Sequence, residues 1–422
     1  FLFFFFFLFF FFFFPFSPPP PPPRVFAKMS VILLALLVPL GIAADVFVGS
    51  APNGSLVLQP AAGQRVLVDG ADFRSLLNTV DALKQQVAAQ AEILDQLRCV
   101  PVVDALTITN PTATAKWSGA VPFNDKIFGV PFNAASVLII DPATETADTS
   151  SMAGLSGSSK WLGGVLARNG KIYGIPHDSP AVLIVDPAAM ATDTSAMVGL
   201  GGAAKWAGGA LAPNGKIYGI PDASEAVLII DPDTNTTDIT TITELTTTGK
   251  WTDGVLARNG KIYGIPHHSP SVLIIDPATN TADTTTISGL NGFAKWHTGV
   301  LGGNGKIYGI PFSATSVLIV DPATNTADTA ALANAGNGVH KWVGGLVADS
   351  GRIYGIPYTS TSVLIIDPAS NTTDTTSVRN LDGNAAKWRG GVLAGNGKIY
   401  AVPWAGPSVL TLAQRCELRR KL

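Results

Sequence analysis

The chain has 422 residues with a formal net charge of −2, and only 14% of its residues are charged. This balance excludes a strongly basic face of the kind that binds nucleic acid. Hydrophobic residues make up 47% of the chain, and 43 glycines and 30 prolines divide it into short segments. Such a composition is typical of stacked sheets joined by many turns.

The first 28 residues are almost wholly Phe and then Pro. The Phe-rich tract over residues 1–14 is too short to span a bilayer comfortably and has no globular role. We interpret residues 1–28 as a low-complexity leader that is not part of the native protein. A membrane anchor formed by Phe1 to Phe14 is the alternative.

Residues 29–44 have the pattern of a signal peptide. Arg24 and Lys28 precede an apolar stretch from Val31 to Leu40, and small residues follow as far as Ala44. The pattern predicts a secreted or cell-surface protein whose mature form has no membrane span. Glycosylation triplets support secretion and lie at Asn53, Asn235 and Asn371.

Two further segments precede the main domain. Residues 45–70 are expected to form a short β segment, strand-turn-strand in outline. Residues 71–98 carry a heptad pattern and predict a helix of about 26 residues. Its a positions are Phe73, Val80, Val87 and Leu94, and its d positions are Leu76, Leu83, Gln90 and Leu97. A coiled coil through residues 73–97 would make the protein a homo-oligomer, dimeric or trimeric; an amphipathic helix packed on the main domain is the alternative.

A repeat occupies most of residues 99–422. The dipeptide Lys-Trp marks seven copies, 44 to 46 residues apart, and its lysines are Lys116, Lys160, Lys205, Lys250, Lys295, Lys341 and Lys387. Within one copy an apolar run, an Asn-Gly turn at Asn259, a second strand, the run Val272 to Ile275, and a Thr-rich segment follow in order. A repeat of this length with four short strands predicts an all-β, seven-bladed β-propeller with four-stranded blades.

The two ends of the repeat region predict how the ring closes. Asp104 to Thr109 matches a fourth strand with no first three before it, and the seventh copy stops after its third strand near Leu412. We expect the N-terminal strand to complete the seventh blade. Cys99 and Cys416 then fall in the same turn of that blade, and in a secreted protein they would form a disulfide.

Ligand-binding residues are expected on one face of the ring. The residue after the Pro that ends strand two is aromatic or His in six of seven copies: Phe132, His177, Asp222, His267, Phe312, Tyr358 and Trp404. Rings stack on sugar faces, and the seven lysines would bind acidic groups of an extracellular glycan or protein ligand. Alternatively, the Lys-Trp pairs pack between blades, with each Lys stem covering the Trp ring.

The repeat resembles those of YVTN-type β-propellers of surface-layer proteins, and more loosely NHL repeats. The similarity lies in Asn259-Gly260-Lys261-Ile262-Tyr263 and in Ser271 to Thr281, and it extends over about residues 104–413. It implies the propeller fold. Those families include adhesive, scaffolding and enzymatic members, so the resemblance carries over no ligand site.

Two functions fit the sequence. The first is a secreted, oligomeric binding, adhesion or scaffold protein that uses a propeller face and is expected to be no enzyme. The second is a propeller hydrolase or lyase that uses loop histidines such as His177 and His267. No catalytic residue, cofactor or metal site is predicted, because adjacent His267 and His268 lack a further ligand nearby.

Overall fold

A computed structural model describes residues 46–50, 56–60, 67–68, 71–72, 79–87, 97–107, 114–246, 249–383 and 386–418. The chain divides into two compact units, Cys99–Glu417 and a second one formed by Phe1–Arg98 with Leu418–Leu422. The leader and signal peptide expected over residues 1–44 lie outside the described residues. No described helix is long and apolar enough to cross a membrane.

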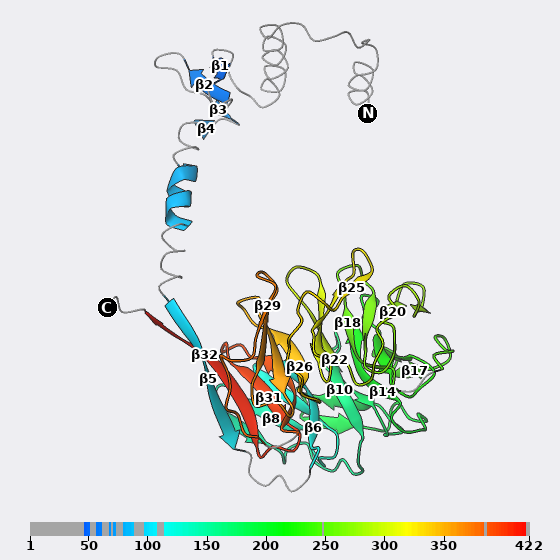
Figure 1. Cartoon of the computed structure of the whole chain (residues 1–422). Helices are drawn as coiled ribbons and strands as arrows, with labels where there is room; N and C mark the ends of the chain where they lie inside the picture. The colour runs from blue at the N-terminus through cyan, green and yellow to red at the C-terminus, as the bar shows by residue number, and fades with distance from the viewer. Residues whose placement is uncertain are drawn as a thin grey trace, which may run out of the picture. The chain divides into compact units, whose positions relative to one another are not determined.

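The larger unit is a seven-bladed β-propeller, as predicted (Figure 1). Each blade is a four-stranded antiparallel sheet, and in blades 1 to 6 the strands follow one another in chain order. The strands of the first three blades are β6 (Trp117–Phe123), β7 (Lys126–Pro131), β8 (Leu138–Asp141) and β9 (Thr146–Asp148); β10 (Trp161–Leu166), β11 (Ile172–Pro176), β12 (Leu183–Asp186) and β13 (Ala191–Asp193); and β14 (Trp206–Leu211), β15 (Ile217–Pro221), β16 (Leu228–Asp231) and β17 (Thr236–Asp238).

The next three blades repeat this arrangement. Their strands are β18 (Trp251–Leu256), β19 (Ile262–Pro266), β20 (Leu273–Asp276) and β21 (Thr281–Asp283); β22 (Trp296–Leu301), β23 (Ile307–Pro311), β24 (Leu318–Asp321) and β25 (Thr326–Asp328); and β26 (Trp342–Val347), β27 (Ile353–Pro357), β28 (Leu364–Asp367) and β29 (Thr372–Asp374).

Blade 7 is assembled from both ends of the repeat region. It contains β30 (Trp388–Leu393), β31 (Ile399–Pro403), β32 (Ser408–Leu418) and β5 (Leu97–Thr107), in that order. The predicted closure by an N-terminal strand is therefore confirmed, and β5 lies beside β32 in Figure 1. The expected turn around Cys99 and Cys416 is wrong: both residues lie within strands. In the other blades a turn connects the third strand to the fourth. In blade 7 these strands, β32 and β5, come from opposite ends of the repeat region, so no turn is needed and both strands continue.

The gradient of burial across a blade follows from the sequence of each strand. In blade 4, every residue of the second strand is buried, and so is the apolar part of the third strand, because neighbouring blades cover both faces. The Thr-rich fourth strand remains partly exposed at the outside.

The innermost strands approach so closely that a Cβ on Gly344 would lie 2.6 Å from Cα of Gly390. This contact explains the glycines in strand one.

The Trp of each Lys-Trp pair is the first residue of the innermost strand and does not belong to the preceding loop. Trp206 is buried between blades 2 and 3, against Tyr173 and Ile184 on one side and Leu228 on the other. Its Nε1 donates to the carbonyl of Ala226, 2.7 Å away. The corresponding indole of each other blade donates to the carbonyl twenty positions later, or nineteen in blade 1. The Trp residues therefore pack between blades.

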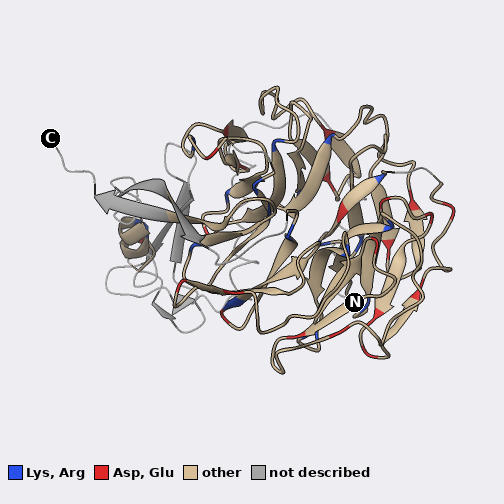
Figure 2. Ribbon diagram, turned by 90° about the horizontal axis from the view of Figure 1, so that it is seen from below, with Lys and Arg blue, Asp and Glu red and all other residues tan. Residues whose placement is uncertain are grey.

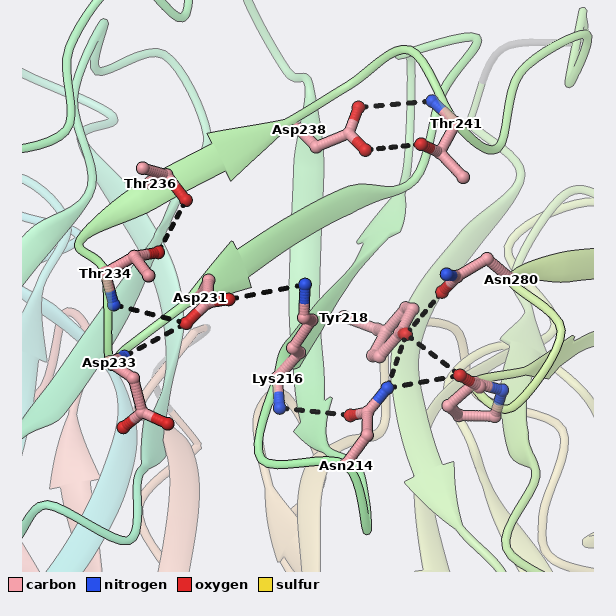
Figure 3. Close-up of polar contacts among 11 residues, drawn as sticks. Asn214, Lys216, Tyr218, Asp231, Asp233, Thr234, Thr236, Asp238, Thr241 and Asn280 are labelled. Carbon is pink, nitrogen blue, oxygen red and sulfur yellow. Dashed lines mark hydrogen bonds and ion pairs between the residues drawn. The ribbon is translucent and has the colours of Figure 1, made fainter.

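Polar side chains repeat the same contacts from blade to blade (Figure 3). The amide of Asn214 accepts from the backbone N–H of Lys216 and donates to the carbonyl of Pro277 in the next blade, at 3.0 and 3.1 Å. The Tyr218 hydroxyl donates to Asn280 over 2.6 Å. Ion pairs such as that of Lys216 with Asp231 (3.3 Å) place opposite charges side by side, and Figure 2 shows both signs around the ring.

The N-terminal unit contains two small antiparallel hairpins and a helix. One hairpin joins β1 (Val46–Ser50) to β2 (Leu56–Pro60), and the other joins β3 (Leu67–Val68) to β4 (Ala71–Asp72). The described helix spans 79–87, which is much shorter than the predicted 26 residues. Residues 71–72 and 97–98, assigned to that helix from the sequence, belong to β4 and β5, so the coiled-coil stalk is not supported beyond this short helix.

Candidate functional site

A belt of backbone hydrogen bonds runs around one face of the propeller. The residue after strand two donates its N–H to the carbonyl of the Lys in its own blade, and its carbonyl accepts from the next blade's Lys. Asp222, for example, donates to Lys205 (2.9 Å) and accepts from Lys250 (3.2 Å). Lys116 N–H to Trp404 O, 2.9 Å, closes the belt between blades 1 and 7. We call the seven belt residues other than Lys the face ring: Phe132, His177, Asp222, His267, Phe312, Tyr358 and Trp404.

The belt lysines are buried, with only 1–5% of their surface exposed. The ammonium of Lys295 donates to the carbonyls of His267, Ser269 and Gly292, at 3.0, 2.9 and 2.9 Å. Burial lowers the Lys295 pKa to about 8, although three carbonyl acceptors favour its charged form. The lysines expected to meet a ligand (Lys116, Lys160, Lys205, Lys250, Lys295, Lys341 and Lys387) instead tie loops of adjacent blades together, and the candidate site does not include them.

The aromatic members of the face ring contact one another around the axis. Successive ring centroids from His177 through Phe132, Trp404, Tyr358 and Phe312 to His267 lie 4.8 to 6.5 Å apart. The series is interrupted only in blade 3, by Asp222. All of these residues except Trp404 line a cavity of about 460 Å³, together with Asp222. The sequence prediction placed these residues on one face, and the structure brings them together there.

A second tier of side chains lies beneath this cavity and was missed from the sequence. It consists of the residue after each Trp, and we call it the inner ring: Ser118, Leu162, Ala207, Thr252, His297, Val343 and Arg389. All of them except Ala207 line the central channel, a cavity of about 190 Å³. Five of them also line the face cavity: Leu162, Thr252, His297, Val343 and Arg389. The sequence does single out this position, because it carries one Arg and one His where the other blades have small or apolar residues.

Arg389 is the charged residue of the inner ring. Its guanidinium carbon lies 4.4 Å from the ring centre of Trp404, and Nη2 donates to Nε2 of His297 over 3.0 Å. Among the residues that the structure describes, no carboxylate forms an ion pair with it. Burial lowers its pKa to about 10, which still leaves it charged at neutral pH.

The hydrogen-bond network assigns the tautomers of two histidines. His297 Nε2 accepts from Arg389, so its proton is on Nδ1. His268 Nδ1 donates to the Gly249 carbonyl and lies 2.9 Å from His267 Nδ1, which therefore accepts and leaves the proton of His267 on Nε2. That N–H and the Nε–H of Arg389 are buried and have no acceptor among the described residues. The cluster therefore contains two N–H donors, His267 Nε2 and Arg389 Nε, without an acceptor among the described residues.

Burial controls the charge of the histidines. It lowers the pKa of His267 to about 3, with His268 adding to the shift, and lowers that of His297 well below its ordinary value. It also lowers the pKa of His177, whose Nδ1 lies 2.8 Å from Asp178 but is not aligned for a hydrogen bond. These three imidazoles are therefore neutral at neutral pH.

Two carboxyl groups have a raised pKa, and burial is the main cause for both. Asp222 lines the face cavity. Asp253 lines the central channel, where it accepts from Gly254 N–H (2.9 Å) and Gly299 N–H (3.2 Å), and its pKa is about 7. In the described part of the chain, no group of three or more His, Cys, Asp or Glu residues could hold a metal ion.

Comparison with known proteins supports the fold and leaves the family open. No protein-family model matches the chain, and no curated protein matches its sequence. A streptogramin B lyase structure is similar with a TM-score of 0.62 and 10% identity, covering 75% of this chain and 98% of that one. A catalytically inactive virginiamycin B lyase from Staphylococcus aureus with quinupristin gives 0.58 and 11%, covering 74% and 99%.

An extracellular domain assigned to a hybrid two component system of B. thetaiotaomicron is also similar, with a TM-score of 0.56 and 10% identity, covering 77% of this chain and 44% of that one. At these identities the similarity shows the fold alone. The chain is a seven-bladed β-propeller protein, and the resemblance to YVTN-type repeats is not supported by a family match.

Proposed function

We propose that the protein is a binding protein whose face cavity holds a ring-bearing ligand with an acidic group, such as an acidic sugar. The observation that carries this proposal is the pair of N–H groups without an acceptor, Arg389 Nε and His267 Nε2. A buried donor without a partner costs about 1–3 kcal/mol, and more when it is charged. A carboxylate, sulfate or phosphate group would supply the missing acceptors.

The aromatic wall supports a ligand with a flat face. Tyr358 and Phe312 line the cavity, and Trp404 continues their series and packs against the Arg389 guanidinium. Aromatic rings of this kind pack against sugar faces, while an Arg holds the acidic substituent at a defined angle. The cavity volume of about 460 Å³ is in the range of small-molecule sites.

We further propose that the protein is secreted or attached to the cell surface and acts as an oligomer through residues 73–97, in adhesion or as a scaffold. The described helix supports the second part, because the heptad residues Val80, Leu83 and Val87 are 45%, 54% and 63% exposed. These positions share one face of the helix, and a second copy would cover them. Several copies would multiply weak contacts made by separate cavities.

The loop histidines give the hydrolase or lyase alternative little support. A general base at neutral pH works best with a pKa near the working pH, whereas the His267 pKa is about 3 and that of His297 is also strongly lowered. Similarity to solved lyases at 10–11% identity does not transfer their activity.

Calorimetric titration with glucuronate and glucose, after a glycan-array screen, tests the binding proposal. We expect glucuronate to bind at least about tenfold more tightly than glucose, since a buried charge-assisted pair is worth 1.5–3 kcal/mol. Arg389→Gln should abolish this difference, and Trp404→Ala should weaken both ligands. Arg352→Gln, at an exposed arginine paired with Asp367, is the control.

The same variants separate binding from catalysis. If the protein turns over a glucuronide and His177→Ala or His267→Ala abolishes turnover, the enzyme alternative is correct. If glucuronate and glucose bind equally, or Arg389→Gln leaves the preference intact, the acidic-ligand proposal fails.

A further inference from the structure

The face cavity contains an acidic side chain opposite its basic one. Asp222 belongs to blade 3 and Arg389 to blade 7, so blades 1 and 2 separate them on one side and blades 4 to 6 on the other. In a ring of seven, no two blades are farther apart. The two side chains form no ion pair, yet Arg389 still acts on the Asp222 carboxyl through its charge, so both face the same enclosed space.

Asp222 has no hydrogen-bond or ion-pair partner for its carboxylate among the described residues. Two of the groups around it donate to other acceptors. His268 uses its Nδ1–H on the Gly249 carbonyl, and the Lys250 ammonium donates to Ser224 O over 2.8 Å. The Asp222 carboxylate is partly buried, so solvent still reaches it. A ligand that fills the cavity would displace that solvent and would have to supply a donor in its place.

The face ring presents one further feature at this position. Asp222 interrupts the aromatic series between His177 and His267, so a positive group bound there would lie between two neutral imidazoles, which do not repel it. Lone hydroxyl groups of a sugar would also bond a carboxylate, but they would not balance its charge.

The charges of the cavity decide between these ligands. Among the side chains that line the cavity, Arg389 contributes one positive charge, Asp222 contributes one negative charge, and the imidazoles of His177, His267 and His297 are neutral. The Lys250 ammonium also acts on the Asp222 carboxyl through its charge, but it does not line the cavity. A ligand that is only an anion leaves Asp222 unpaired, and one that is only a cation leaves Arg389 unpaired. Complementarity therefore requires both charges in one molecule.

We infer that the ligand is a zwitterion, with its acidic group at Arg389 and His267 and an ammonium group at Asp222, as in an amino sugar acid or an amino acid with a flat side chain. This inference rests on the proposed function and deepens it. It assigns Asp222 as the residue that distinguishes a zwitterion from a simple acid.

Two matched sets of probes test the inference by calorimetry on the full chain. The sugar set is muramate, glucuronate and glucosamine; the aromatic set is phenylalanine, 3-phenylpropanoate and phenethylamine. In at least one set we expect the zwitterion to bind ten times or more tightly than both relatives. Asp222→Asn should remove the advantage over the acid, and Arg389→Gln should remove the advantage over the amine.

Asp233→Asn is the matched control, because Asp233 is an exposed acid in the same blade. Thermal melting of each variant verifies that it folds. If the simple acid binds as tightly as the zwitterion, or if Asp222→Asn leaves their ratio unchanged, the zwitterion inference is wrong and the acidic-ligand proposal stands. If no probe binds the wild-type protein at millimolar concentration, both are rejected.

Discussion

The guanidinium of Arg389 donates a hydrogen bond to Nε2 of His297, 3.0 Å away, and so joins blade 7 to blade 5 across the inner end of blade 6. Both residues occupy the position after the Trp, where other blades have Ser, Leu, Ala, Thr or Val. The repeat itself does not need either side chain there. A desolvated cation paired only with a neutral imidazole reduces stability, and such exceptions to a repeat are typical of binding sites.

Replacing Arg389 with Met should therefore separate stability from binding. We expect an unchanged or higher stability, by up to about 1–4 kcal/mol, because the uncompensated charge is replaced by an apolar chain of similar length. Glucuronate binding should be lost. Differential scanning calorimetry and titration measure the two effects. Arg352→Met, at a 52% exposed side chain, is the control, and a large fall in Tm for Arg389→Met would contradict the expectation.

Truncating a belt lysine should have the opposite effect. Lys295→Ala leaves the Ser269 and Gly292 carbonyls without this donor, and we expect a loss of about 2–4 kcal/mol from the free energy of unfolding. Lys306→Ala removes only a surface ion pair with Asp321 and should cost less than about 1 kcal/mol. Urea denaturation of both variants makes the comparison, and equal losses would show that the buried contacts add nothing.

The sequence predicted the propeller well because the information for it is repeated. Each Lys-Trp pair marks one blade, and the unmatched strand from Asp104 shows which end completes the ring. The length of the N-terminal helix was not predictable in this way. A heptad pattern marks positions that could pack against another helix, but it does not mark where the helix begins and ends.

The site was only half predictable. The face ring could be identified because the Pro that ends strand two fixes its position in every copy. The lysines were misplaced because a Lys is exposed by default, and three carbonyls from separate loops converge on Lys295 only in the folded protein. The contact of Arg389 with His297 joins residues 92 positions apart in the chain, so no local pattern records it.

We expect Cys99 and Cys416 to form a disulfide. They lie on β5 and β32, which are neighbours in blade 7 but come from opposite ends of the propeller domain. A disulfide that closes the long loop between Cys99 and Cys416 would stabilise the fold by roughly 5 kcal/mol in the chain-entropy model. Peptide mapping without reductant should recover the cross-linked pair, and Cys416→Ser should lower Tm. Two free thiols would refute the bond.

Acid should destabilise the propeller between about pH 4 and pH 2. The hydroxyls of Ser151, Thr241 and Thr286 donate to Asp148, Asp238 and Asp283, and lower each Asp pKa to about 2 from 3.8. A carboxyl whose folded pKa is lowered contributes stability above its unfolded pKa, and this contribution is lost as the pH falls through the folded value. Partial exposure limits it to about 1 kcal/mol or less per blade.

Melting temperatures at pH 7, 5, 4, 3 and 2 measure this effect. We expect little contribution from these groups to any change between pH 7 and pH 5, followed by a decline below pH 4. The Asp238→Asn variant should start from a lower Tm and lose less on acidification, because it lacks one of these groups, which also include Asp374. An identical decline in the variant and the wild type would exclude Asp238 as a source.

In blade 5, a substitution can add the hydrogen bond from a hydroxyl group to the Asp of the fourth strand. Its Asp328 accepts only the backbone N–H groups of Ala330 and Ala331, at 2.7 and 3.1 Å, because Ala331 stands where blades 1, 3 and 4 have Ser or Thr. Ala331→Thr should supply the missing hydroxyl donor, lower the Asp328 pKa further, and stabilise the protein by about 0.5–1 kcal/mol.

Chemical denaturation at pH 7 and pH 2 tests this substitution. The gain should be present at pH 7 and disappear at pH 2, because protonated Asp328 no longer accepts as a carboxylate. Ala327→Thr is the control: it places the same side chain on β25, one residue before Asp328, and should give no gain that depends on pH. A gain of equal size at both pH values would indicate strand propensity as the cause and rule out the added hydrogen bond.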